Sequence, residues 1–157
     1  MKWKSWLDRW GMTSLSISTG FAEAEFQPQT GDREAAWELY IELLTRITTQ
    51  PLSEDFGNEK TALESVYSIF GLTREIIRAE GPSCIEFTKI AIVVLNQIIR
   101  PFTAHWHRQS LDGSFDDPEQ CARFRTELKE LQKSLLTYTR MLGDMAGVED
   151  LTALEQN

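Results

Sequence analysis

An unbroken alternation of three- and four-residue steps between apolar side chains constrains this fold more than any other feature. The positions are Cys121, Phe124, Leu128, Leu131, Leu135, Tyr138, Leu142 and Met145. This spacing is typical of a helix that packs lengthwise against other helices. Asp117 is a suitable N-cap and Pro118 suits the first helical position, so we expect the helix to begin there. The seam is expected to lie in an intramolecular core, with pairing to another chain as the alternative.

Two helices are predicted earlier in the chain from their caps and apolar spacing. Asp32 is a suitable N-cap for a helix that runs to about Gln50, before a proline. Its expected core positions are Trp37, Tyr40, Leu44 and Ile47. The next helix is expected to begin after Asn58 and to end near Glu80, where glycine and proline follow.

A third helix is predicted from a capping box, in which Ser83 and Glu86 satisfy each other's backbone donors. It has a broad apolar surface between Phe87 and Ile99, which predicts the most buried of the helices. Pro101 lacks an amide hydrogen, so we expect it to end or kink this helix.

Four long helices with short connections predict a mainly α chain folded as an antiparallel four-helix bundle. A chain of 157 residues suits a single domain. Within it we expect an N-terminal segment of residues 1–31, a bundle of residues 32–148 and a flexible tail of residues 149–157.

The N-terminal segment is distinguished by its tryptophans. Trp3, Trp6 and Trp10 share one face of a short predicted helix, with lysines on the remaining surface. Residues 14–18 and 22–26 then alternate apolar and polar side chains, which favours a short β-hairpin. The tryptophan face has three open interpretations: it packs on the bundle, anchors a partner protein, or inserts residues 1–11 into a membrane surface.

The net charge of −8 excludes general nucleic-acid binding, because the phosphate backbone repels an acidic protein. The longest apolar run, Ile90–Leu95, is shorter than the roughly 20 residues of a membrane-spanning helix. No signal peptide is recognised after Met1. Cys84 and Cys121 lie outside any CxxC pair, and we expect a cytoplasmic protein with free thiols.

One segment gathers the residue types that bind anions. Its members are Arg100, His105, Trp106, His107 and Arg108. Arginine matches phosphate and carboxylate oxygens, and aromatic rings stack on bases, so the segment is a candidate site for a nucleotide or another anion. The structural alternative is that the aromatic residues close the bundle while the arginines pair with carboxylates. His105 and His107 are two apart, which is unsuitable for one metal on a helix, and no metal site is predicted.

No phosphate-binding glycine loop, nucleophile elbow or metalloprotease motif occurs in the chain, so neither an enzymatic activity nor a cofactor is predicted. The stretches DREAAWELYIELLTRITTQPL, residues 32–52, and IRPFTAHWH, residues 99–107, resemble small all-helical bacterial proteins to which no activity is attached. The resemblance implies a component of a bacterial multi-protein system, with defence and stress loci as examples. We therefore expect a non-enzymatic interaction or regulatory protein that binds a partner protein or itself. A small-ligand sensor and a peripheral membrane protein are the alternatives.

Overall fold

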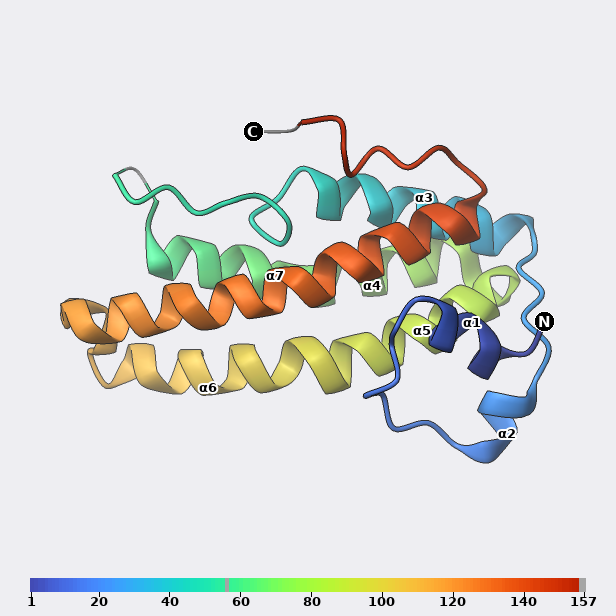
Figure 1. Ribbon diagram of the computed structural model, residues 1–157, viewed down its shortest axis with the longest axis horizontal. Coiled ribbons are helices and arrows are strands. Elements are labelled where there is room, and N and C mark those ends of the chain that lie inside the picture. The colour runs from blue at the N-terminus through green and yellow to red at the C-terminus, as the bar shows by residue number, and fades with distance from the viewer. Residues whose placement is uncertain (56, 156–157) are drawn as a thin grey trace.

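The computed structural model describes residues 1–55 and 57–155, which are mainly helical and contain no strand. The predicted α class is therefore confirmed. Figure 1 shows the long helices lying lengthwise beside one another. The elements are α1 (Trp3–Arg9), α2 (Thr19–Glu23), α3 (Thr30–Leu44), α4 (Glu59–Glu80), η1 (Gly81–Cys84), α5 (Ile85–Val94), η2 (Leu95–Ile99), α6 (Arg100–Leu111), η3 (Ser114–Asp116) and α7 (Pro118–Ala146).

The ends of α4 and the start of α7 follow the predicted caps. The Asn58 side chain accepts a hydrogen bond from Thr61 N, and Asp117 accepts one from Glu119 N. Gly81 and Gly147 end the two helices with positive φ angles of 67° and 72°, a conformation that glycine adopts without steric cost. In the predicted seam of α7, every residue from Phe124 onward is buried, whereas Cys121 is half-buried.

Helix α3 differs from its prediction in both its limits and its buried face. Gln29 is the N-cap, and the helix ends at Leu44 because side chains take its last carbonyl groups. Thr48 Oγ1 donates to Leu43 O at 2.9 Å and Gln50 Nε2 donates to Leu44 O at 2.9 Å. The buried side chains are Ala35, Ala36, Leu39, Tyr40 and Leu43, whereas Trp37 is exposed.

The buried carboxylate of Asp32 caps two helices at once. Its Oδ2 accepts a hydrogen bond from Gln29 N at 2.8 Å, and its Oδ1 accepts one from Phe87 N at 2.9 Å. The predicted capping box of Ser83 and Glu86 is therefore wrong, because Asp32 from α3 supplies the acceptor at the start of α5. Ser83 instead lies in η1, and its hydroxyl donates to Glu80 O.

A π-helical turn carries the chain past Pro101. The Arg100 amide donates to Leu95 O, a bond five residues back, and α6 continues directly from η2 to Leu111. A proline ring collides with the carbonyl group four residues before it in an α-helix, and a π turn widens the backbone at that place. The helix therefore does not end near Arg100.

The predicted β-hairpin is wrong. Residues 19–23 form α2, whose N-cap Ser18 accepts a hydrogen bond from Phe21 N. The following residues pair instead with the start of the chain, where Trp3 N donates to Ala24 O and Phe26 N donates to Met1 O. The alternation was too short to distinguish a strand from a helical turn with a polar cap.

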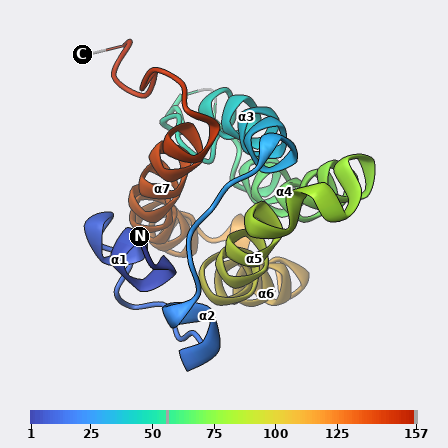
Figure 2. The ribbon, with the colours of Figure 1, turned by 90° about the vertical axis from the view of Figure 1, so that its right-hand side faces the viewer.

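The N-terminal segment lies against the helices at one end of the molecule. Figure 2 shows α1 and α2 beside α7 and α5 when the molecule is viewed along its length. Helix α3 packs against both α7 and α4, and α4 packs against α6. Close approach of α3 to α7 needs Gly143, since a Cβ there would lie 3.0 Å from the Tyr40 ring.

The continuous helical run of residues 59–111 contains an 18-residue stretch with a mean hydropathy of 1.4, of which 33% is buried. By length and composition it is the one stretch among the described residues that is apolar enough to cross a membrane. The sequence analysis considered only uninterrupted apolar runs, of which Ile90–Leu95 is the longest. It did not identify this stretch, because polar residues interrupt the apolar residues of the stretch. Core helices of globular proteins satisfy the same criterion.

Replacement of Asp32 by alanine is expected to lower the free energy of unfolding by about 2–4 kcal/mol, because the buried Phe87 amide and the part-buried Gln29 amide lose their acceptor. Urea denaturation followed by circular dichroism measures the change. Asp8→Ala is the matched control, since Asp8 is exposed. A loss below about 0.5 kcal/mol for Asp32→Ala would contradict the double-cap interpretation.

Candidate functional site

The five residues predicted to bind an anion are distributed around α6 rather than gathered in one pocket. Trp106 is fully buried, and its indole N–H donates to Glu127 Oε2 at 2.6 Å. Arg108 is exposed and lies 3.9 Å from Asp112 Oδ2 in a weak ion pair. His105 is exposed and contacts the Trp106 ring edge to face.

Arg100 and His107 are seven residues apart and both meet α4. The Arg100 guanidinium lies 4.7 Å from the centre of the Phe70 ring, and the His107 ring lies 4.8 Å from that of Tyr67. The structure thus brings two of the five residues to one side of α6. Among the described residues, no three His, Cys, Asp or Glu side chains are grouped as a metal site requires.

Trp3 and Trp6 lie in the core and have no exposed surface to offer a partner or a membrane. The Trp3 indole N–H donates to Glu86 Oε2 of α5 at 2.6 Å, and that of Trp6 donates to Asp144 Oδ2 of α7 at 2.7 Å. Trp10 is half-buried, and its indole nitrogen has no hydrogen-bond partner among the described residues. The tryptophan face therefore joins α1 to two long helices.

A cavity of about 560 Å³ lies under the loop that joins α3 to α4. Arg125 and Gln132 of α7 line it, but their donors are already used by the loop backbone and by Glu59 of α4. Arg125 donates to the carbonyl groups of Leu52 and Gly57, and Gln132 donates to Ile47 O at 2.6 Å. These side chains hold the loop in place, so the cavity is a weaker candidate for a binding site.

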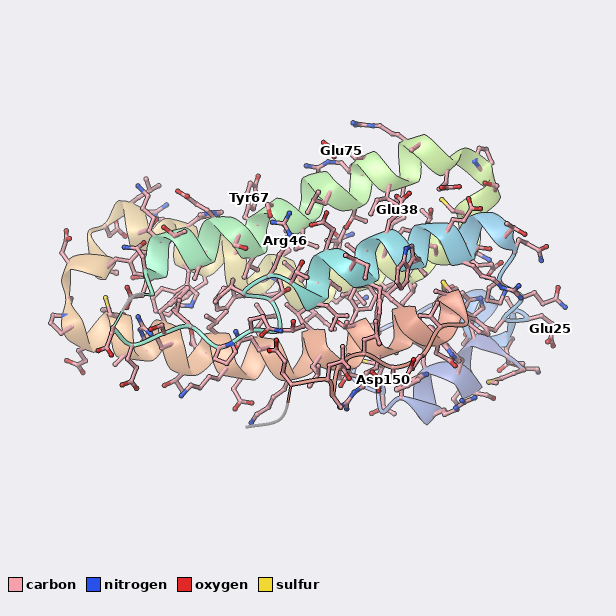
Figure 3. All side chains as sticks on the ribbon, turned by 90° about the horizontal axis from the view of Figure 1, so that it is seen from above. Glu25, Glu38, Arg46, Tyr67, Glu75 and Asp150 are labelled. Atoms are coloured by element: carbon pink, nitrogen blue, oxygen red, sulfur yellow. The ribbon has the colours of Figure 1, made fainter. Side chains whose placement is uncertain are left out.

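A groove of about 490 Å³ on the outer surface between α3 and α4 is the stronger candidate. Its apolar lining consists of Trp37, Ile41, Leu72, Ile76 and Ala79. The Trp37 side chain is 41% exposed and stacks on Tyr40 with ring centres 5.9 Å apart. Glu38, Glu42 and Glu75 complete the lining, and Figure 3 shows Glu38 between α3 and α4.

The two ends of this groove differ in charge. At the C-terminal end of α3, Arg46 pairs with Glu42 at 2.8 Å and donates to Ser68 Oγ of α4 at 3.1 Å. At the other end, partial desolvation raises the pKa of Glu80, and the neighbouring charges of Glu34 and Glu38 raise it further. This end therefore brings three carboxylates together.

The sequence interpretation missed this site because it placed Trp37 in the core. Two sets of residues in α3 have the spacing of a buried helix face. The set that is buried includes the small residues Ala35 and Ala36 together with Leu39 and Leu43. A signal was present in Glu34, Glu38 and Glu42, which recur every four residues and so form one acidic stripe.

Replacement of Trp3 by alanine is expected to lower the free energy of unfolding by about 3–5 kcal/mol, because the residue is fully buried. Trp3→Phe should cost about 1–3 kcal/mol, since it leaves the Glu86 carboxylate without its indole donor. Chemical denaturation checks both values. Trp37→Ala is the control and should change stability by less than about 0.5 kcal/mol; an equal loss there would contradict the assignment of Trp3 to the core.

Replacement of Glu80 by glutamine is expected to raise the melting temperature at pH 7. The raised pKa of Glu80 means that the folded state bears a cost for its ionised form, and protonation removes this cost as the pH falls through that pKa. The gain should therefore shrink toward pH 4. Differential scanning calorimetry across this range measures it, with the exposed Glu130→Gln as control. A melting temperature that falls at pH 7 would contradict the prediction.

Comparisons with protein-family models, with curated proteins and with solved structures find no match to this chain. The choice of the α3–α4 groove as the candidate site therefore depends on its geometry, burial and charge.

Proposed function

We propose that this protein is a non-enzymatic helical interaction protein that binds a segment of a partner protein in the α3–α4 groove. The observation that carries the proposal is the exposure of Trp37 beside an apolar groove with an acidic border. Exposed tryptophan is costly to leave in water and is favoured among the residues that dominate binding energy at interfaces. We place the protein in the cytoplasm of a bacterium, as a component of a multi-protein system.

We infer that the scaffold of this surface is an antiparallel four-helix bundle of α3, α4, the continuous α5–α6 helix and α7. Support comes from the lengthwise packing of α3 against α4 and α7, and of α4 against α6. A rigid helical scaffold suits recognition, because its groove is formed before the partner arrives and little ordering is needed on binding.

The burial of Trp3 and Trp6 moves the proposed interface away from α1. A partner could reach these two side chains only if α1 left the core, which would break their hydrogen bonds to Glu86 and Asp144. Trp37 requires no such rearrangement. The same argument weakens the proposal of a membrane anchor at residues 1–11.

A second candidate function is anion sensing by Arg100 and His107. The observation in its favour is that Arg100 lies over the Phe70 ring and forms no ion pair with a carboxylate among the described residues. The groove is the better-supported site, since it combines a concave apolar surface with charged lining residues that are all glutamates.

Site-specific photo-crosslinking in the host tests the proposed function. A photoreactive amino acid at position 37 is expected to capture one protein, and the purified pair should form a complex that Trp37→Asp weakens at least about tenfold. Tyr67, which is 50% exposed on α4, is the matched control position. Equal capture at positions 37 and 67, or a complex insensitive to Trp37→Asp, would overturn the proposal.

A further inference from the structure

The geometry points to a basic amphipathic helix of another protein as the occupant of the α3–α4 groove. This inference rests on the proposed function and specifies the chemistry of the partner. The apolar side chains of this partner helix would contact the apolar lining of the groove, which includes Trp37 of α3 and Ala79 of α4. Its lysine or arginine side chains would lie against the glutamates along the border.

The shape of the groove fits a helix. Its α4 wall runs from Leu72 to Ala79, which at 1.5 Å per residue is about 10 Å. A docked helix covers this distance with anchors at positions i, i+3 or i+4, and i+7, the pattern of helix-in-groove recognition. The described residues contain no strand that an extended peptide could join by β-augmentation.

The charges along the groove select the sign of the partner. Five glutamates border it or lie at its open acidic end, namely Glu34, Glu38, Glu42, Glu75 and Glu80. Among the described residues that line the groove there is no lysine or arginine, and Arg46 at the C-terminal end of α3 is already paired with Glu42. A cationic segment is therefore attracted, whereas an anionic one is repelled.

The raised pKa of Glu80 is consistent with this choice, because desolvation and, after it, the neighbouring charges of Glu34 and Glu38 disfavour the ionised form of its carboxyl group. Lysine or arginine side chains placed between Glu34, Glu38 and Glu80 would relieve that repulsion.

Other occupants fit less well. A second copy of the chain has a net charge of −8, and the tryptophan face of its most basic segment is used in its own core. The C-terminal segment of the same chain contains Glu149, Asp150 and Glu155, so it has the wrong sign. Nucleic acids and anionic membranes are excluded by the same repulsion.

Peptide titration of the full-length protein tests the inference. The probe is a helical peptide of about 16 residues with leucines at i, i+4 and i+7 and lysines on the flanking positions. One control peptide has glutamate in place of every lysine, and another has serine in place of every leucine. Calorimetry is expected to show binding of the first peptide alone, weakening at least about tenfold as ionic strength rises from about 0.05 to 0.5 M.

Variants of the protein locate the binding. Glu38→Lys combined with Glu75→Lys should weaken the lysine–leucine peptide at least about tenfold, and Trp37→Ser should do the same. Glu130→Lys combined with Glu155→Lys makes the same charge change at exposed positions outside the groove and should have little effect. Circular dichroism confirms that each variant is folded.

Three outcomes would overturn the inference: equal binding of the glutamate peptide, equal binding of the serine peptide, or indifference to the groove substitutions. If crosslinking at position 37 captures a partner whose bound segment is not a basic helix, the inference fails and the proposed function stands. If position 37 captures nothing and no peptide binds, both fail.

Discussion

The carboxylate of Asp32 is the interaction on which the arrangement of the helices depends. It is fully buried and accepts hydrogen bonds from the backbone amides at the starts of α3 and α5. The positive ends of two helix dipoles thus meet at one carboxylate, which their amide hydrogen bonds stabilise in the core. Gly31 allows this meeting, since a Cβ at that position would collide with Ser83 of η1. The two helices are therefore fixed at their N-terminal ends.

A second set of polar contacts joins α1 to α5 and α7, and α6 to α7. The buried indoles of Trp3, Trp6 and Trp106 each donate to a carboxylate on another helix, α5 for Trp3 and α7 for the other two. An indole combines a large apolar surface with one donor, so it fills the core and also specifies which helix lies beside it. Most of the tryptophan content is used in this way, which distinguishes Trp37 on the surface as the residue whose exposure needs a functional reason.

The α3–α4 groove follows from how these contacts place the helices. Asp32 and η1 hold the start of α3 near the end of α4, and Arg46 bridges the same two helices at the other end. Between these two sets of contacts, the side chains of Ile41, Leu72 and Ala79 are too small to fill the space between the helices, and a groove remains. The acidic stripe of α3 then borders an apolar floor, a combination that favours a cationic amphipathic partner over any anionic one.

The sequence by itself determined the helical class, the caps of α4 and α7 and the seam of α7, because these depend on side chains within a few residues of one another. Only the tertiary structure decided that Asp32 caps α5, that Trp6 binds Asp144, and that residues 24–26 pair with the chain start. Those contacts join residues far apart in sequence, and local periodicity contains no information about them. The groove was hidden for a related reason: two faces of α3 were equally apolar, and only packing against α7 and α4 selected the one that is buried.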